Sequence, residues 1–128
     1  MTEAGLQFIR DVMAGAGIPY EFMEFTSPIS SLKSYWVGEY SESDSRNEDG
    51  GQETQFILTG TGRGSWLDLE NQKETIEQLF PANGGKTAIL GNGTGIAVFY
   101  GNAFPVPTGD GFLKRLRVNL TVKEWRTK

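Results

Sequence analysis

The side chains that could do chemistry in this chain are mainly carboxylates, because its 128 residues include no cysteine and no histidine. Disulfides, thiol nucleophiles, zinc sites of the usual ligand types and Ser-His or Cys-His catalytic pairs are therefore excluded. Asp44, Glu48 and Asp49 could be read as a calcium loop, but their spacing does not match an EF-hand and no helices flank them. A solvated acidic loop is the better interpretation. We expect no catalytic residues, no metal and no cofactor, and therefore no enzyme.

Two glycine-containing motifs could hold a phosphate or another anion. Gly85-Lys86-Thr87 resembles the end of a phosphate-binding loop, but Phe80 stands where such a loop needs glycine, and a helix rather than a strand precedes it. Gly60-Thr-Gly-Arg-Gly64 lies between a predicted strand and a predicted helix, where backbone N–H groups can bind anions, but its spacing is not the dinucleotide fingerprint. We interpret both motifs as turns, with Ser65 or Asp68 as the cap of the following helix.

Charged residues are distributed unevenly along the chain. The net charge of −4 argues against broad binding of nucleic acids, which depends on Lys and Arg side chains. Residues 39–53 contain six acids and one base, whereas residues 112–128 contain six bases and one acid. This polarity suits head-to-tail contact between identical subunits, although both segments could also be solvated surfaces. The predicted subunit interface consists of Glu42, Asp44, Glu48, Asp49, Arg115, Arg117 and Lys123.

The periodicity of the apolar residues predicts the elements that would position these charges. Apolar residues from Leu6 to Ala16 recur at helical spacing, with Thr2 as N-cap and Gly17 beyond the end. A second helix is predicted over residues 68–80, where Pro81 stops it. Strands are predicted near residues 19–25, 35–40, 55–59, 87–90 and 95–100, with a hairpin turn at 91–94 and loops at 26–31, 41–52, 60–65 and 104–111.

The clearest strand is the last one. Leu116, Val118, Leu120 and Val122 alternate there with polar and basic residues, so one face should be buried and the other should be basic. No repeat or linker divides the chain. We expect an α+β fold, with residues 1–128 forming a single domain in which a mixed, mostly antiparallel β-sheet packs against two main α-helices.

The start of the sequence contains neither a basic segment nor an apolar segment of the kind found in secretory signals, and no stretch of about 18 apolar residues occurs. We therefore expect a soluble protein made in a reducing cytoplasm. Trp36, Trp66 and Trp125 could line a groove that binds a carbohydrate or a peptide. The alternative is that these rings form the core and subunit contacts.

Several stretches, taken in order, resemble the small tail-terminator or tail-completion proteins of long-tailed bacteriophages and prophages of Gram-positive bacteria. The stretches are a short helix ending Ala16-Gly-Ile-Pro-Tyr20, Tyr35-Trp-Val-Gly-Glu-Tyr40, Asp49-Gly-Gly-Gln-Glu53, Phe56-Ile-Leu-Thr-Gly60, the turn at Trp66, Leu79-Phe-Pro81, Gly95-Ile-Ala-Val-Phe-Tyr100, Phe104-Pro-Val-Pro-Thr-Gly-Asp110 and Leu116-Arg-Val-Asn-Leu-Thr-Val-Lys-Glu-Trp125. Together they cover nearly the whole chain. Each is a structural signature, so the likeness lies in their order and carries no catalytic residue.

This resemblance implies a structural virion protein that forms a homo-oligomer, expected as a hexameric ring. Such a ring caps the tail tube, terminates tube polymerisation and contacts the head-completion or connector proteins. The protein would reside in the virion tail and, during assembly, in the cytoplasm of the bacterial host, with no membrane and no sequence-specific nucleic acid among its partners. The alternatives are a neck, head-completion or other minor tail protein, and a small carbohydrate- or peptide-binding module.

Overall fold

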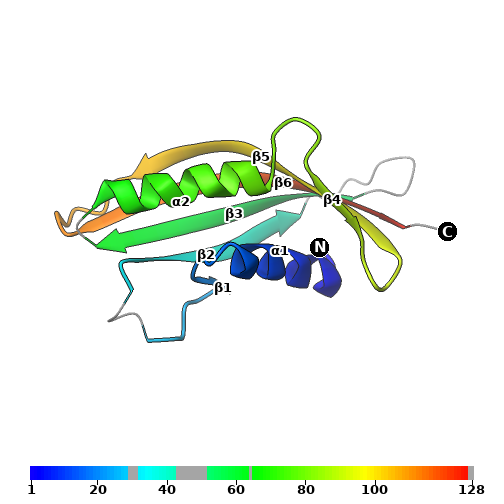
Figure 1. Ribbon diagram of the computed structural model, residues 1–128, viewed down its shortest axis with the longest axis horizontal. Coiled ribbons are helices and arrows are strands. Elements are labelled where there is room, and N and C mark those ends of the chain that lie inside the picture. Colours follow the sequence, from blue (N-terminus) through cyan, green and yellow to red (C-terminus); the bar gives the residue numbers. More distant parts are fainter. Residues whose placement is uncertain (29–31, 43–51, 64, 127–128) are drawn as a thin grey trace.

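The computed structural model describes residues 1–28, 32–42, 52–63 and 65–126, which form two α-helices and six β-strands (Figure 1). In chain order these are α1 (Glu3–Gly15), β1 (Tyr20–Phe22), β2 (Ser34–Glu42), β3 (Gln52–Arg63), α2 (Trp66–Leu79), β4 (Lys86–Ile89), β5 (Thr94–Val106) and β6 (Leu113–Arg126). The strands form one sheet in the order β1-β2-β3-β6-β5-β4. The sheet curves into a half-barrel. Only the β1–β2 pair is parallel, so the predicted α+β class is confirmed.

Both helices lie against the same face of the sheet, which we call the helix face (Figure 1). Ile9 and Met13 of α1 and Leu69 and Ile76 of α2 are fully buried in one continuous hydrophobic core. Helix α2 is also fastened to β2 through Gln72. Its Oε1 accepts hydrogen bonds from the Trp36 indole (2.7 Å) and the Ser34 hydroxyl (2.8 Å). The opposite face of the sheet, which we call the open face, carries neither of the two helices found in the described residues.

Helix α1 begins and ends where the sequence predicts. The Thr2 hydroxyl accepts a hydrogen bond from Gly5 N (3.0 Å), which satisfies one of the free N–H groups of the first turn. Gly17 ends the segment at φ +72°, a conformation that glycine adopts without steric cost. At the start of α2 the Ser65 hydroxyl accepts from Leu67 N (3.1 Å), so Ser65 and not Asp68 is the cap.

The predicted burial of β6 is confirmed. Leu116 is 2% exposed and Val118, Leu120 and Val122 are fully buried, while the alternate side chains point to the open face. The Asn92-Gly93 hairpin between β4 and β5 is also confirmed, with Gly93 at φ +82°. The turn at Gly84 and Gly85 is present too, with both residues at positive φ.

Residues 60–63 do not form the predicted turn, because they continue β3 as far as Arg63. Gly60 lies beneath the Trp36 ring, and a Cβ at this position would meet that ring at 2.7 Å. Gly62 lies similarly beneath Leu69. The glycines here make room for large side chains from β2 and α2. No anion cradle forms at Gly60-Thr-Gly-Arg, while Gly64 lies outside the described residues.

Other expected boundaries are also wrong. The predicted loop at 104–111 begins later, because Phe104 to Val106 extend β5 and pair with β6. Strand β1 has only three residues because Met23 turns the chain at φ +68°. Of the loop expected at 41–52, Ser41 and Glu42 belong to β2 and Gln52 to β3, and residues 43–51 lie outside the described part of the chain.

Candidate interaction surface

The open face is built from alternate residues of the central strands. Arg115 lies beside Thr61 of β3, which lies beside Tyr35 of β2. One step along, Arg117 lies beside Thr59, which lies beside Val37. Except for Thr61, which is buried, these side chains are half-buried although no helix covers them. The open face is therefore a mixed surface in which aromatic and aliphatic groups surround a few charges.

The basic residues predicted from the sequence gather on this face. Arg115 and Arg117 lie two positions apart on β6, and Lys123 lies further along the same strand, with its Nζ 5.5 Å from the centre of the Phe99 ring. The Nε atoms of both arginines are shielded from solvent and have no hydrogen-bond acceptor among the described residues. A shielded donor without an acceptor is unfavourable. An outside carboxylate could bind these guanidinium groups through their Nη atoms, or through Nε after a change of side-chain conformation.

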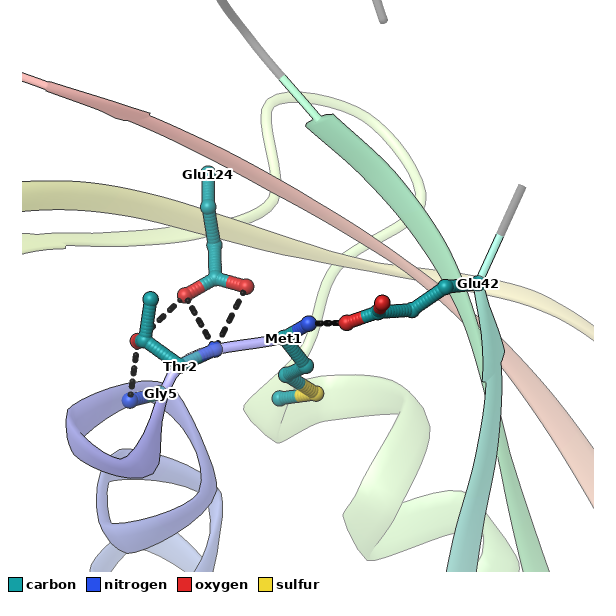
Figure 2. Close-up of polar contacts among 5 residues, drawn as sticks. All are labelled: Met1, Thr2, Gly5, Glu42 and Glu124. Carbon is teal, nitrogen blue, oxygen red and sulfur yellow. Dashed lines mark hydrogen bonds and ion pairs between the residues drawn. The ribbon is translucent and has the colours of Figure 1, made fainter. Parts of the chain in front are cut away.

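The predicted acidic partner does not lie on the same face. Glu42 is at the end of β2 on the helix side, beside the buried Thr54, and forms an ion pair with the amino group of Met1 (Figure 2). Asp44, Glu48 and Asp49 lie outside the described residues. Within one chain, the structure therefore brings Arg115, Arg117 and Lys123 onto one surface and places Glu42 on the other.

Glu124 is a polar residue whose role the sequence reasoning missed. It is 5% exposed, and its carboxylate accepts hydrogen bonds from Thr2 N (3.2 Å to each oxygen) and from the Thr2 hydroxyl (2.6 Å), as Figure 2 shows. Since Thr2 caps α1, this carboxylate ties the helix to the end of β6. The alternation of β6 is a signal that could have shown the burial of Glu124, because this residue follows Val122 by two positions and therefore belongs to the buried face.

A hollow of about 370 Å³, open to solvent, lies on the open face beside β2. Met23, Phe25 and Tyr35 line its apolar side, and Glu39 and Arg115 contribute charged groups. The Phe25 and Tyr35 rings pack with their centres 4.8 Å apart. Met23 stands in a γ-turn, in which Glu24 N donates to Phe22 O (2.9 Å) at positive φ. That conformation costs a non-glycine residue on the order of 1–3 kcal/mol.

The segment that carries Met23 and Phe25 is held by Glu21. The Glu21 carboxylate accepts hydrogen bonds from the Thr26 hydroxyl (2.8 Å) and from the backbone N–H groups of Thr26 and Ser27. Hydrogen bonding from the side chains of Ser27 and Thr26, and then from the Thr26 backbone, lowers the pKa of Glu21 to about 2. The ionised carboxylate therefore stabilises the turn after β1.

We expect an NMR pH titration to place the pKa of Glu21 near 2. Because the folded-state pKa is depressed, the contribution of Glu21 to stability is fully present above the ordinary value of 4.5 and is lost as the pH falls from there towards 2. The Thr26→Ala variant should raise the pKa of Glu21, because it removes one of the hydroxyl donors. An unchanged Glu21 titration in that variant would show that these hydrogen bonds do not form.

The three tryptophans do not share a groove. Trp36 is fully buried on the helix face, where its indole donates to Gln72. Trp66 and Trp125 are 39% and 36% exposed but stand at opposite ends of the sheet, since Trp66 follows β3 and Trp125 pairs with Gly95. Gly95 is needed there, because a Cβ would meet the Trp125 ring at 2.2 Å. In this structure Trp36 belongs to the core, and the Trp125 ring packs over Gly95.

No cluster of three or more acidic side chains that could hold a metal ion occurs among the residues described. Burial raises the pKa of Tyr20 and of Tyr100, so both phenols stay protonated at neutral pH. Neither helix in the described part of the chain is long and apolar enough to cross a membrane.

Comparison with known proteins bears on the fold alone. No protein-family model matches the chain, and no curated protein matches it. One solved structure that carries no functional name is similar over 98% of this chain and 93% of its own, with a TM-score of 0.66 and 16% sequence identity. The two proteins therefore share the α+β half-barrel over essentially their whole lengths.

Proposed function

We propose that this chain is a structural subunit that assembles with copies of itself, and that it is a tail-terminator protein of a long-tailed bacteriophage or prophage. In this role a hexameric ring of subunits caps the tail tube, stops its polymerisation and contacts the head-completion or connector proteins. The order of the sequence stretches described above supports the assignment to phage tails. The open face supports an assembly role.

The observation that carries the assembly role is the pair of arginines on β6. Arg115 and Arg117 lie two positions apart on the open face, and their Nε atoms have no acceptor among the described residues. A carboxylate of a neighbouring subunit would supply acceptors in the planar geometry that guanidinium groups prefer. We propose that this carboxylate belongs to Glu42, the last residue of β2, or to Asp44, Glu48 or Asp49, which come after β2 in an acidic segment of the sequence. Glu42 would have to exchange its present partner, the Met1 amino group.

The contact would be heterologous, because the acids and bases belong to different surfaces of each subunit. Heterologous contacts generate a closed ring when the rotation between neighbouring subunits equals a full turn divided by a whole number. Exposed ion pairs contribute only about 0–1 kcal/mol each, so the half-buried apolar side chains of the open face must supply most of the binding free energy. The charges then set orientation and the rate of encounter.

Light scattering across a concentration series tests the ring. We expect a mass six times that of the 14.1 kDa chain, with closed rings in electron micrographs of the same sample. Addition of purified tail-tube protein should give tubes capped at one end. A mass of one chain at every concentration, with and without tube protein, would reject the assembly role. Rings that bind a connector protein but no tube would point to a neck protein instead.

Charge reversal tests which surface closes the ring. The double variant Arg117→Glu with Lys123→Glu should weaken association by at least about tenfold at low salt, with a smaller effect at high salt. Reversal of Asp44 and Glu48 to Lys in the same chain should restore part of the loss. The control variant Arg10→Glu with Lys86→Glu carries the same change in net charge at exposed positions of α1 and β4, and should assemble normally. Equal losses in both double variants would mean that only net charge matters.

A further inference from the structure

The loop between β5 and β6 presents one aromatic side chain to solvent. Phe112 is 81% exposed, which is the largest exposed fraction of any large apolar side chain in the described residues. The loop lies at the end of the sheet where α2 begins (Figure 1, orange). Exposed aromatic rings at such tips are frequent anchors of protein contacts.

This loop is held in one conformation by its own polar groups. The Thr108 hydroxyl donates to Leu113 O (2.8 Å) and accepts from Asp110 N (3.1 Å). The Asp110 carboxylate accepts from Phe112 N (2.9 Å), and Lys114 Nζ donates to Gly111 O (2.8 Å). Phe112 is therefore displayed on an ordered support, and binding through it does not have to order the loop first.

The hollow on the open face lies at the same end of the sheet. Tyr35 and Arg115, which line the hollow, are joined through Thr61 in the register of the strands, and Arg63 pairs with Leu113 at the base of the Phe112 loop. The hollow has an apolar side formed by Met23 and Phe25 together with Tyr35, against which an aromatic ring could pack.

The hollow is lined by one carboxylate, Glu39, and one guanidinium, Arg115, and the loop carries a carboxylate that can pair with the guanidinium. Asp110 stands two residues before Phe112, and its carboxylate can accept further hydrogen bonds beside the one from Phe112 N. Arg115 lines the hollow with an Nε that has no acceptor among the described residues. An aromatic ring placed in the hollow from this loop would bring a carboxylate to that guanidinium.

We propose that the occupant of the hollow is Phe112 of a second copy of this chain, with Asp110 of that copy beside Arg115. Because the loop and the hollow lie at one end of the sheet, two copies related by a twofold axis make both contacts at once. This contact differs from the head-to-tail ring contact in its symmetry and in its carboxylate, but it uses the same Arg115 and the same open face, so one subunit cannot make both contacts through that face at once. It requires neither a ring nor a phage tail partner.

Methyl NMR of protein labelled at the methionine methyl groups tests the contact. We expect the Met23 signal to move with protein concentration, whereas the Met13 signal stays constant because that side chain is buried in the core. Phe112→Ala should weaken self-association by roughly 30-fold or more, as expected when an interface anchor is lost. Ile89→Ala is the matched control, since Ile89 is 64% exposed but lies on β4, at the far edge of the sheet.

The Asp110→Asn variant tests the charged part of the contact. Asparagine keeps an oxygen that can accept from Phe112 N, so the loop is retained while the negative charge is lost. We expect an association about threefold to tenfold weaker, with the difference shrinking as salt is added.

Three results would overturn the proposal. They are a Met23 signal that is independent of concentration, a Phe112→Ala variant that associates as the parent does, and an Ile89→Ala variant that loses as much as Phe112→Ala. Rings that form normally in the Phe112→Ala variant, with an unmoved Met23 signal, would remove this contact and leave the ring. A dimer that depends on Phe112, with no larger assembly, would establish this contact and reject the ring. Loss of binding to a different protein alone would assign Phe112 to that partner and reject the second copy.

Discussion

Leu120→Ala is expected to lower the free energy of unfolding by roughly 2–5 kcal/mol, because it leaves a cavity in the middle of the sheet. Leu120 is fully buried and lies between Phe56 of β3 and Tyr100 of β5. Neither neighbour can close the gap without leaving its own packed position, since both belong to the core or pack against it. Urea denaturation of the monomer, at a concentration too low for assembly, measures the loss.

The matched control is Arg117→Ala on the same strand. Arg117 lies three residues before Leu120 and points to the open face, so its removal leaves no cavity in the core and should change the unfolding free energy far less than removal of Leu120. The two variants together separate the two faces of β6. Equal losses of monomer stability would contradict the assignment of Leu120 to the core and Arg117 to the surface.

Glu124→Ala should cost roughly 1.5–3 kcal/mol, the range for hydrogen bonds to a charged group. The substitution leaves Thr2 N and the Thr2 hydroxyl without their acceptor and frees the start of α1. Amide exchange in the first turn of α1 should therefore become faster, while exchange in α2 should not change. A global measurement by denaturation and a local one by exchange report the same contact independently.

Glu53→Ala is the control for Glu124. Glu53 is an exposed acid on β3. In the register of the strands it pairs with Lys123, the residue that precedes Glu124. Its removal changes net charge equally but breaks no hydrogen bond among those described. If both variants lose the same stability, charge rather than the Thr2 contact explains the effect.

Elements whose local pattern agrees with their packing were predicted well from the sequence. Helix α1 has a capping threonine, apolar residues at helical spacing and a terminal glycine, and β6 alternates strictly. Strand β3 was predicted too short because Gly60 and Gly62 are ordinary turn residues in isolation. Their presence in a strand depends on Trp36 and Leu69, which are brought over them only by the tertiary fold.

The candidate surface was predicted in part. The basic side chains of β6 follow from its alternation, so their common face was expected. Glu42 follows Trp36 by six residues and therefore shares its face, but this was not expected because the sequence placed residues 41–52 in a loop and not in β2. The hollow could not be predicted, because it combines the turn at Met23 with residues from three strands. The anchoring role of Glu124 requires knowing that α1 starts beside the end of β6.

The position of β6 between β3 and β5 also determines when this protein can fold during synthesis. Every other strand in the described chain emerges from the ribosome before β6, yet β3 and β5 meet only through it. Until β6 is made, the β1-β2-β3 and β4-β5 segments have no common sheet, and the contact of Thr2 with Glu124 has to close a loop that spans nearly the whole chain. The strand that completes the core also carries Arg115, Arg117 and Lys123. A nascent chain therefore acquires its folded core and its basic surface in the same step.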